Sequence, residues 1–526
     1  MSSTPPTATA DGASLFFADA RSCRAWLGSL AVSNVAQTLS SVLDALRVFN
    51  RATFDPLERL KCLELVRDRV AFMVGEQRTR VFARPLPHAA GDVSAWETTR
   101  QVLEELEGGY RRALALPELA PHGALVTQRI VRYVAAQMLL NAVVYRPFDG
   151  ALWQRLHQAY AGAERAGFAE ERVKDSLEAE GGASNVAEAY AQAVLLDAAG
   201  LHEMNAAQVA FVEALLKSWG RKVKVLKAAP PESAAVQPMV VDLAGSQGAV
   251  AVPPDSLAGS QRVIFVEEIG KSLRRRIRVL LAGEDATSLG LPAATGVDLA
   301  STLQRLAKRW CEASAPEAPL AAVSGKQAGL VLGLNESHFF LSGGKAFEQP
   351  GKERVLTSQE NNDLAVFGRV TERTQSMMAT AGPSFTLDSW DIVGEALGSI
   401  RLRRGTTGSR AATVGRLVAV RTSASAPFQL GMIRALFNKD EGIEAVVALY
   451  PGKPEPLAAR ATGAWVQAIG LPAIEKLGVP PTLVVPPAMA SRGRALQVRD
   501  AEDTRDAKVQ EVLEREAEFA RVVAGS

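Results

Sequence analysis

The spacing of apolar residues changes along this chain from a helical period to a strand period, and this change limits the folds that the chain can adopt. Between residues 36 and 220 apolar side chains recur every three or four positions, which predicts amphipathic helices. Between residues 385 and 450 they form short runs separated by turn residues, which predicts strands. We therefore expect a multidomain α+β protein, with an N-terminal α-helical bundle, a mixed middle region and a small antiparallel β-barrel near the C-terminus.

Length and composition agree with several folded domains. The chain has 526 residues, of which 47% are hydrophobic and 22% charged, and this balance excludes wholesale disorder. At roughly 150 residues per domain, the length corresponds to about three and a half domains. Stretches rich in alanine, proline and glycine divide the chain into a helical domain (14–227), a linker (228–238), a mixed α/β region (239–313), a second linker (314–325), a hairpin and helix leading into the barrel (326–380), the barrel (381–465) and a polar C-terminal tail with a helix (486–526).

Charge, hydropathy and cysteine content exclude several classes of protein. The 59 Lys and Arg residues nearly balance the 57 Asp and Glu residues, so the net charge of +2 gives no field that would attract DNA or RNA, and neither partner is expected. No apolar run reaches the roughly 18 residues of a membrane span, and Met1–Ala13 lack a secretory pattern. The three cysteines, Cys23, Cys62 and Cys311, are far apart, as is usual in a reducing compartment. We expect a cytoplasmic protein.

Capping residues place several helix ends in the first half. Asp55-Pro56 is typical of a cap followed by proline in the first turn. Asn205 and Gln208 have the spacing of a capping box, and Gly220 stands where a left-handed residue would end that helix. These signals indicate helices joined by short breaks, as in a bundle.

Two arrangements of these helices are open. Trp153, Leu156 and Tyr160 have the spacing that opens a tetratricopeptide repeat, but His157 replaces the usual glycine and no second copy follows. A bundle without repeats is therefore favoured over a repeat array. In either case we expect this half to supply packing, or a surface for a protein partner.

The middle region is expected to mix strands with helices. Short apolar runs at Met239–Leu243 and Ala249–Pro253 predict strands, and Phe265–Gly283 and Val297–Cys311 predict helices. The first of these helices has a basic cluster, which is either an anion clamp or, as we favour, a solvated face; its members are Arg274, Arg275, Arg276 and Arg278.

Two further segments are assigned from their turns and charges. Ala328–Phe347 predicts a hairpin, because Asn335-Glu336 separate two apolar runs. Gly343-Gly344-Lys345 lacks the spacing of a phosphate-binding loop, so a nucleotide-hydrolysing site is excluded. Arg499–Val523 is highly charged and predicts an exposed or partner-binding helix.

Short strands follow one another closely before the polar tail. A sheet of this kind avoids exposed edges by closing, so the pattern predicts a small antiparallel barrel. The five expected strands are Phe385–Val393, Ile400–Arg404, Val414–Arg421, Phe428–Phe437 and Ile443–Tyr450, and Asn438–Gly442 is expected to form a hairpin loop.

Part of this barrel resembles a known family. The stretch Trp390–Leu402 (WDIVGEALGSIRL) is similar to the first hairpin of a PilZ domain, and the strands VGRLVAVR, LGMIRALF and IEAVVALY follow in the order of that barrel. The resemblance covers Val366–Arg460. PilZ domains are bacterial receptors for cyclic di-GMP, so the resemblance implies that the barrel binds this dinucleotide.

The resemblance also implies a set of ligand-binding residues. Arg369 and Arg373 have the Arg-x-x-x-Arg spacing that precedes a PilZ barrel, and guanidinium groups can stack on guanine or fork onto phosphate. The family's turn motif, Asp/Asn-x-Ser-x-x-Gly, aligns with a turn of small residues that departs from it at each motif position. The remaining candidates lie in and just after this turn: Gly394, Glu395, Ala396, Gly398, Ser399, Arg401 and Arg403.

The sequence contains no motif for catalysis. The five histidines are scattered singly, without a partner at metal-ligand spacing, and neither a nucleophile elbow nor a dinucleotide-binding turn occurs. We therefore expect no catalytic residue, no metal, no cofactor and no enzymatic activity. The leading hypothesis is a non-catalytic signalling protein, a PilZ-like receptor or relay for cyclic di-GMP. The alternative is a ligand-free helical scaffold whose altered PilZ-like barrel mediates protein–protein interaction.

Overall fold

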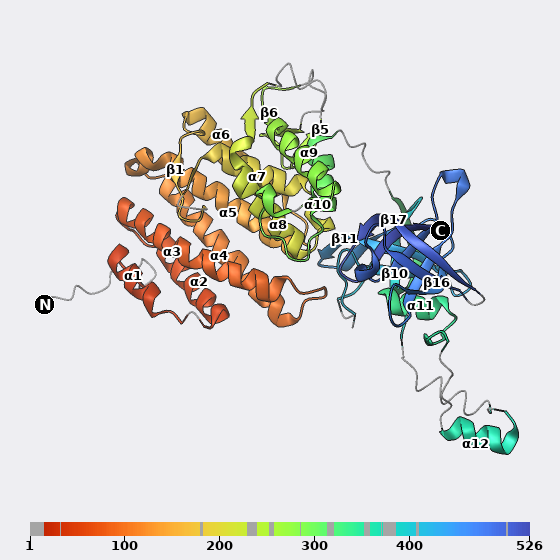
Figure 1. Ribbon diagram of the computed structural model, residues 1–526. Coiled ribbons are helices and arrows are strands. Elements are labelled where there is room, and N and C mark those ends of the chain that lie inside the picture. The colour runs from red at the N-terminus through yellow and green to blue at the C-terminus, as the bar shows by residue number, and fades with distance from the viewer. Residues whose placement is uncertain are drawn as a thin grey trace. The chain divides into compact units, whose positions relative to one another are not determined.

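The computed structural model divides the chain into two compact units (Figure 1). One comprises Met1–Pro316 with Phe437–Lys439, and the other comprises Glu317–Leu436 and Asp440–Ser526. The expected α+β architecture, with N-terminal helices, a mixed middle and a C-terminal antiparallel barrel, is confirmed. The residues whose structure is described are 15–31, 33–178, 182–228, 239–251, 257–284, 286–312, 320–351, 358–369, 371, 385–406, 410–500 and 503–525.

The first unit begins with a set of helices whose starts are fixed by local side chains. The Asp55 carboxylate accepts the Glu58 N–H, with Pro56 in the first turn, and Asn205 forms a capping box with Gln208. Gly220 does not end its helix in the left-handed region as expected: its φ is −53° and it begins a 3₁₀ turn. The helices are α1 (Ala20–Ser29), α2 (Val35–Arg51), α3 (Pro56–Gln77), α4 (Ala90–Leu114), α5 (Gly123–Val143), α6 (Gly150–Ala166), α7 (Val186–Ala198) and α8 (Ala206–Trp219).

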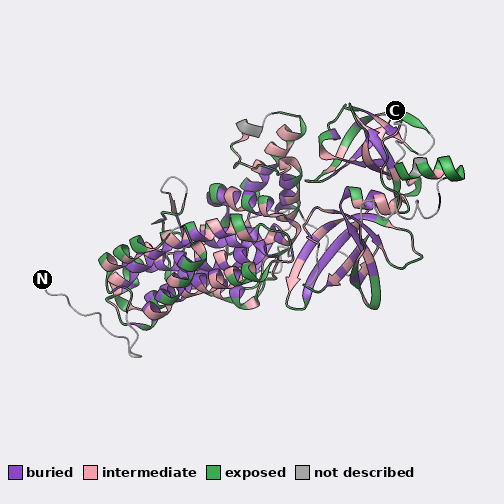
Figure 2. Cartoon of the chain, turned by 90° about the horizontal axis from the view of Figure 1, so that it is seen from below, coloured by how far each residue is buried: buried purple, intermediate pink, exposed green. Residues whose placement is uncertain are grey.

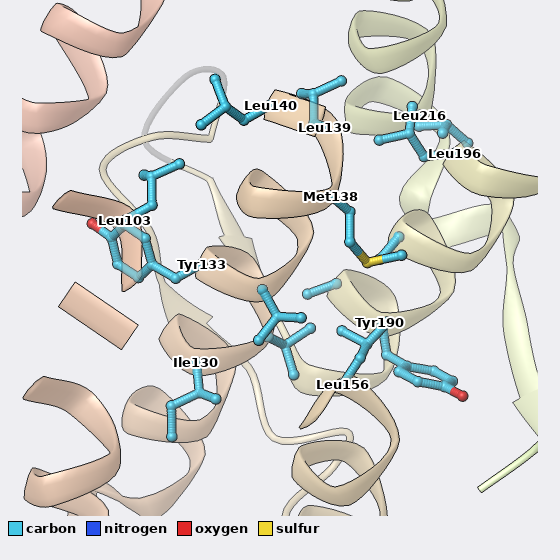
Figure 3. Packing of buried hydrophobic residues seen from close by; sticks show 14 of the residues in the cluster. Leu103, Ile130, Tyr133, Met138, Leu139, Leu140, Leu156, Tyr190, Leu196 and Leu216 are labelled. Atoms are coloured by element: carbon cyan, nitrogen blue, oxygen red, sulfur yellow. The ribbon is translucent and has the colours of Figure 1, made fainter. Parts of the chain in front are cut away.

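Helix α5 is the centre of this unit. It packs against α4, α6 and α7, and nearly every one of its side chains is buried. Figure 3 shows Ile130, Tyr133 and Met138 of α5 among buried residues of neighbouring helices. A helix surrounded by its neighbours is typical of a bundle, and it differs from a row of stacked helix pairs. Sequestering these apolar side chains from water provides the main driving force for folding.

The middle region extends the same core. A four-stranded antiparallel sheet has the order β3-β6-β4-β5, and helices α9 (Glu267–Leu281) and α10 (Leu299–Cys311) pack beside it. Trp310 of α10 donates its indole N–H to the carbonyl of Leu195 in α7. The strands are β3 (Lys224–Leu226), β4 (Met239–Asp242), β5 (Val250–Ala251) and β6 (Gln261–Phe265). The two expected helices are confirmed.

The basic cluster of α9 lies largely in solvent. Arg274, Arg275 and Arg278 are exposed. Arg276 instead packs its guanidinium 5.0 Å from the ring centre of Trp219 and donates to the carbonyl of Leu289. The interpretation as a solvated face therefore agrees with the structure for three of the four arginines.

The second unit contains the expected closed barrel. Its strand order is β10-β11-β12-β9-β8-β7, with six strands where five were expected. The additional strand, β7, closes the sheet by pairing with both β8 and β10. The strands are β7 (Ala321–Leu332), β8 (Asp388–Ala396), β9 (Ser399–Arg404), β10 (Leu417–Arg421), β11 (Gln429–Lys439) and β12 (Gly442–Leu449).

The hairpin expected at Ala328–Phe347 is wrong in its second half. After β7 the backbone turns at Gly333, whose φ of 96° suits glycine, and Leu334–Leu341 form helix α11. Leu334, Ser337 and His338 are buried at helical spacing. The apolar run is too short for its period to distinguish a helix from a strand, and tertiary packing decides the outcome.

The polar tail expected at 486–526 is also wrong, because its residues belong to a second closed barrel. The order of that barrel is β13-β14-β15-β18-β17-β16, and the helix expected at Arg499–Val523 is replaced by β17 and β18. The first barrel accordingly ends with β12 and not at residue 465. The strands are β13 (Glu455–Arg460), β14 (Val466–Leu471), β15 (Thr482–Val485), β16 (Ala495–Arg499), β17 (Thr504–Arg515) and β18 (Ala520–Gly525).

The two barrels share an apolar core of their own. Leu417 and Leu430 of the first barrel pack with Ile469 and Val484 of the second, and Phe519 completes the cluster. All five side chains are fully buried. Figure 2 shows buried residues concentrated inside the barrels and in the centre of the helical unit. The barrels therefore form one folded body.

Candidate functional site

The first candidate site is the hairpin of β8 and β9, on which most of the predicted ligand-binding residues lie. Ala396 pairs with Ser399, so Leu397 and Gly398 form a two-residue turn. Gly398 has a φ of 74° and open space around it, and Leu397 is 106% exposed. The turn is therefore accessible, and glycine suits the positive φ of its second residue.

The register of this hairpin sorts the predicted residues by face. Gly394 pairs with Arg401, across a bulge that follows Ile392, and so shares a face with Arg401 and Ser399. Side chains alternate along a strand, so Glu395, which pairs with Ile400, lies on the opposite face. Glu395 is 3.9 Å from the ammonium of Lys326 on β7. The structure thus brings together Gly394, Ala396, Ser399, Arg401 and Arg403, and separates Glu395 from them.

Two of the predicted arginines are oriented by a buried carboxylate. Arg401 Nε lies 3.1 Å from Glu444 Oε2, and Arg403 Nη2 lies 2.8 Å from Glu444 Oε1. The Glu444 side chain, on the adjacent strand β12, is 2% exposed, whereas those of Arg401 and Arg403 are 32% and 37% exposed. Two guanidinium groups facing one carboxylate leave one net positive charge. This cluster holds two donors at the surface in fixed directions.

The next arginine has a structural position inside the barrel. The Arg404 side chain is 6% exposed, its Nη1 lies 3.0 Å from Asp388 Oδ2, and its guanidinium lies 4.6 Å from the ring centre of Trp390. Burial lowers the pKa of Arg404 while the charge and hydrogen bond of Asp388 act in the opposite direction. Arg404 therefore stabilises the barrel from within and is not available at the outer face.

The predicted Arg-x-x-x-Arg pair is described only at its first member. Arg369 follows helix α12 (Ser358–Phe367) and is exposed. Arg373 lies outside the described residues. The pairing of these two arginines with the hairpin stays a prediction.

Sequence reasoning missed a second candidate site, a cavity of about 360 Å³ within the helical unit. Helices α3, α4, α5, α7 and α8 contribute to its walls. Most of the lining is apolar, and charged side chains of α3, α5, α8 and the loop before α7 also contribute to it. Clefts of this volume between helices are common ligand sites.

A buried ion-pair network adjoins the cavity. Arg67 of α3 bonds to Asp175, and Arg129 of α5 has its Nη1 3.3 Å from Asp175 Oδ2. Burial acts to raise the pKa of Asp175, but the charges of Arg67 and Arg129 outweigh it, with hydrogen bonds from Gln128 and Arg67 adding to their effect, and the pKa falls to about 2. Arg129 also holds Glu64 through two hydrogen bonds of 2.9 Å. The network ties α3, α5 and the β1 segment (Val173–Lys174) together.

One sequence signal points to this network. On α3, Leu60, Leu63 and Val70 form the apolar stripe, and Arg67 falls on the same stripe at helical spacing. A charge on the buried face of a helix needs a partner inside the protein. The sequence does not reveal that partner, because Asp175 lies far along the chain in an irregular segment.

This network makes the helical unit sensitive to acid. The pKa of Asp175 is lower in the folded chain, about 2, than its ordinary 3.8, so its ionised form stabilises the fold above pH 3.8, and that contribution is lost as the pH falls towards 2. Between about pH 5 and about pH 2.5 we expect a loss of about 1–2 kcal/mol from this group. Hydrogen exchange in α3 and α5 measures it. In Asp175→Asn the acid dependence should be weaker; an unchanged dependence would assign it to other carboxyl groups.

The described residues show few features of other kinds of site. Among the described residues no group of three or more His, Cys, Asp and Glu side chains is arranged to hold a metal ion. In the described part of the chain no helix is both long and apolar enough to cross a membrane.

Comparison with known proteins adds one finding. Residues 21–231 match the family model described as the N-terminal domain of the cyclic-di-GMP receptor FimW. This match covers less than half of the chain and ends before both barrels. It includes α1 to α8, and with them the cavity and the ion-pair network. No curated protein and no solved structure matches the chain.

Proposed function

We propose that this chain is a non-catalytic receptor or relay for cyclic di-GMP. The observation that supports this most directly is the likeness of residues 21–231 to the N-terminal domain of a receptor for that dinucleotide. The closed antiparallel barrel that follows in the chain agrees with the PilZ-like architecture expected from the hairpin residues. In this proposal the barrel binds the ligand, and the helical half passes the bound state to a protein partner through altered packing.

The proposed ligand site is the outer face shared by β8, β9 and β12. Arg401 and Arg403 are held by Glu444 and present nitrogen donors at the surface, where they can fork onto phosphate or stack on guanine. Ala396 offers only a methyl group on the same face, next to the turn, whereas Leu320 already covers this face at Gly394. A preformed pair of donors binds an anion with little loss of side-chain entropy.

Calorimetric titration of the full chain with cyclic di-GMP tests this site. Truncating the arginines alone would leave Glu444 buried without a partner, so the triple variant Arg401→Gln/Arg403→Gln/Glu444→Gln removes the cluster as a unit. Two charge-assisted hydrogen bonds account for about 3 kcal/mol or more, so the triple variant should bind about 100-fold more weakly than the natural chain. Glu444→Gln alone keeps both arginines and should bind at least as tightly as the natural chain.

Arg421 provides the matched control for this experiment. It is an arginine on β10 of the same barrel, with its guanidinium 5.0 Å from the ring centre of Phe428 and outside the cluster. Arg421→Gln changes the net charge of the barrel by one and should leave the affinity unchanged. Absence of heat at tens of micromolar protein contradicts the ligand, and a triple variant that binds like the natural chain contradicts the site.

Two observations on the hairpin favour the alternative, a scaffold without nucleotide. Glu444 already partly neutralises Arg401 and Arg403, and the wholly exposed Leu397 at the turn offers an apolar contact. In that case the natural chain gives no heat with cyclic di-GMP, and a partner protein buries Leu397. Leu397→Ser should then weaken retention of the partner in a pull-down, and the triple variant should weaken this retention less.

A further inference from the structure

The cavity of the helical unit is kept open by small side chains. Protein interiors are normally close-packed, so a space of about 360 Å³ requires that the facing positions be short. Ala136 of α5 and Ala189 and Ala193 of α7 line it from one side, and Ala71 and Gly75 of α3 line it from another. Three different helices thus supply a one-carbon side chain, or none, at the same place.

Most of the remaining wall is apolar. Leu139 and Leu140 of α5, Leu196 of α7 and Leu216 of α8 line the cavity. Figure 3 shows Leu139 and Leu140 at the upper end of α5 and Leu196 and Leu216 on neighbouring helices to the right. Such a wall stabilises an apolar ligand by removing it from water.

The charged groups at the cavity give it a preference for anions. Its carboxylates already have cationic partners: Glu213 Oε2 lies 2.7 Å from Arg78 Nη1, and Lys217 Nζ lies 3.0 Å from Glu213 Oε1. Arg78 Nε and Arg132 Nε are buried without a hydrogen-bond partner among the described residues, although Arg132 Nε lies 3.8 Å from Asp175 Oδ2. Guanidinium nitrogens only donate, and buried donors are normally paired. An incoming acceptor would satisfy them.

From these observations we propose that the cavity is a second binding site, which takes a mainly apolar small molecule bearing one acid group. The apolar body lies against the leucines, and the acid accepts from the Nε of Arg78. This ligand differs from the one proposed for the barrel, because a dinucleotide with two phosphates would place most of its polar surface against an apolar wall. The site therefore adds a second input to the helical half.

Decanoate and decanol are suitable probes, since they share an alkyl chain and differ in the acid group. In calorimetric titration of the full chain we expect one decanoate per chain, bound about tenfold or more tightly than decanol, as one charge-assisted hydrogen bond implies. Equal affinity for decanol and decanoate would overturn the proposed role of the acid. Failure of decanoate to bind would overturn the site itself.

Two variants connect binding to the cavity. Ala136→Leu fills the space with little change in helix propensity and should abolish decanoate binding, whereas Ala210→Leu, at an exposed position of α8, should have no effect. Arg78→Gln keeps Glu213 paired with Lys217 and should reduce the affinity for decanoate but not for decanol. Natural affinity in a folded Ala136→Leu protein contradicts the proposal. If that variant does not fold, natural decanoate affinity in Arg78→Gln contradicts it.

The same variants separate this inference from the proposed function. Arg78 and Ala136 both lie in the helical unit and take no part in the Glu444 cluster. Titration with cyclic di-GMP therefore tests the barrel whatever the decanoate result is. Loss of decanoate binding with cyclic di-GMP binding retained assigns the two ligands to two sites.

Discussion

Replacing Asp175 with alanine is expected to reduce the stability of the helical unit by about 3–5 kcal/mol, the range found when a buried ion pair loses one partner. The Asp175 side chain is 1% exposed, and its carboxylate lies between Arg67 and Arg129, whose side chains are each 2% exposed. Without it, two guanidinium groups stay buried with much of their charge uncompensated. Glu64 holds Arg129 on another side and limits the damage at that residue.

Hydrogen exchange of the amides in α3 and α5 measures this loss, because a chain with two units does not unfold in one step. Asp44 is the matched control: it is an aspartate of α2, 63% exposed, whose Oδ1 lies 4.0 Å from Arg47. Asp44→Ala should change stability by less than about 0.5 kcal/mol. If both variants give the same small effect, the network contributes little to folding.

Replacing Trp390 with alanine is expected to destabilise the first barrel by about 3–5 kcal/mol, as truncation of a large core aromatic usually does. Trp390 is 1% exposed and fills space between the strands that enclose the barrel. Its ring also lies against Arg404, so truncation would leave that guanidinium beside a void. Loss of the apolar contacts and loss of the cation–π attraction both destabilise the barrel.

Trp390→Phe separates these contributions. The indole N–H of Trp390 is buried and makes no hydrogen bond to the described residues, so phenylalanine removes ring volume without removing such a bond. Trp390→Phe should reduce the stability of the first barrel by about 1–2 kcal/mol, well below the loss expected for alanine. Hydrogen exchange of the β8 and β9 amides measures the stability loss in both variants. A phenylalanine variant as unstable as the alanine variant would show that volume alone does not explain the effect.

Local signals in the sequence predict much of this fold. The cap at Asp55 and the capping box at Asn205 act within one turn of helix, so their residues alone define the helix starts. The β11–β12 hairpin is equally local: β12 begins at Gly442, whose φ of 136° favours glycine. Such features are determined by residues close together in the chain, or by a residue type that few others can replace.

Features that depend on distant partners were not predictable in the same way. Strand β7 is identified as part of the barrel only by its pairing with β8 and β10, each more than fifty residues away. Strand β17 contains two bulges and a charged outer face, so its apolar residues lose the alternation that identifies a strand. The sequence places the candidate residues on one hairpin, but Gly394, Ala396 and Ser399 lie on its strands and not in its turn. The role of Glu444 depends on β12, which lies beside β9 only in the folded sheet.

The core shared by the two barrels has a consequence for how this protein can be divided. Leu417, Leu430, Ile469 and Phe519 seal one another from water across the boundary between the barrels. A fragment that stops after β12 would expose its half of this shared core as an apolar patch, which would promote self-association. Neither cylinder is therefore a module that could be transplanted by itself, and recombination that keeps the protein soluble must move both together.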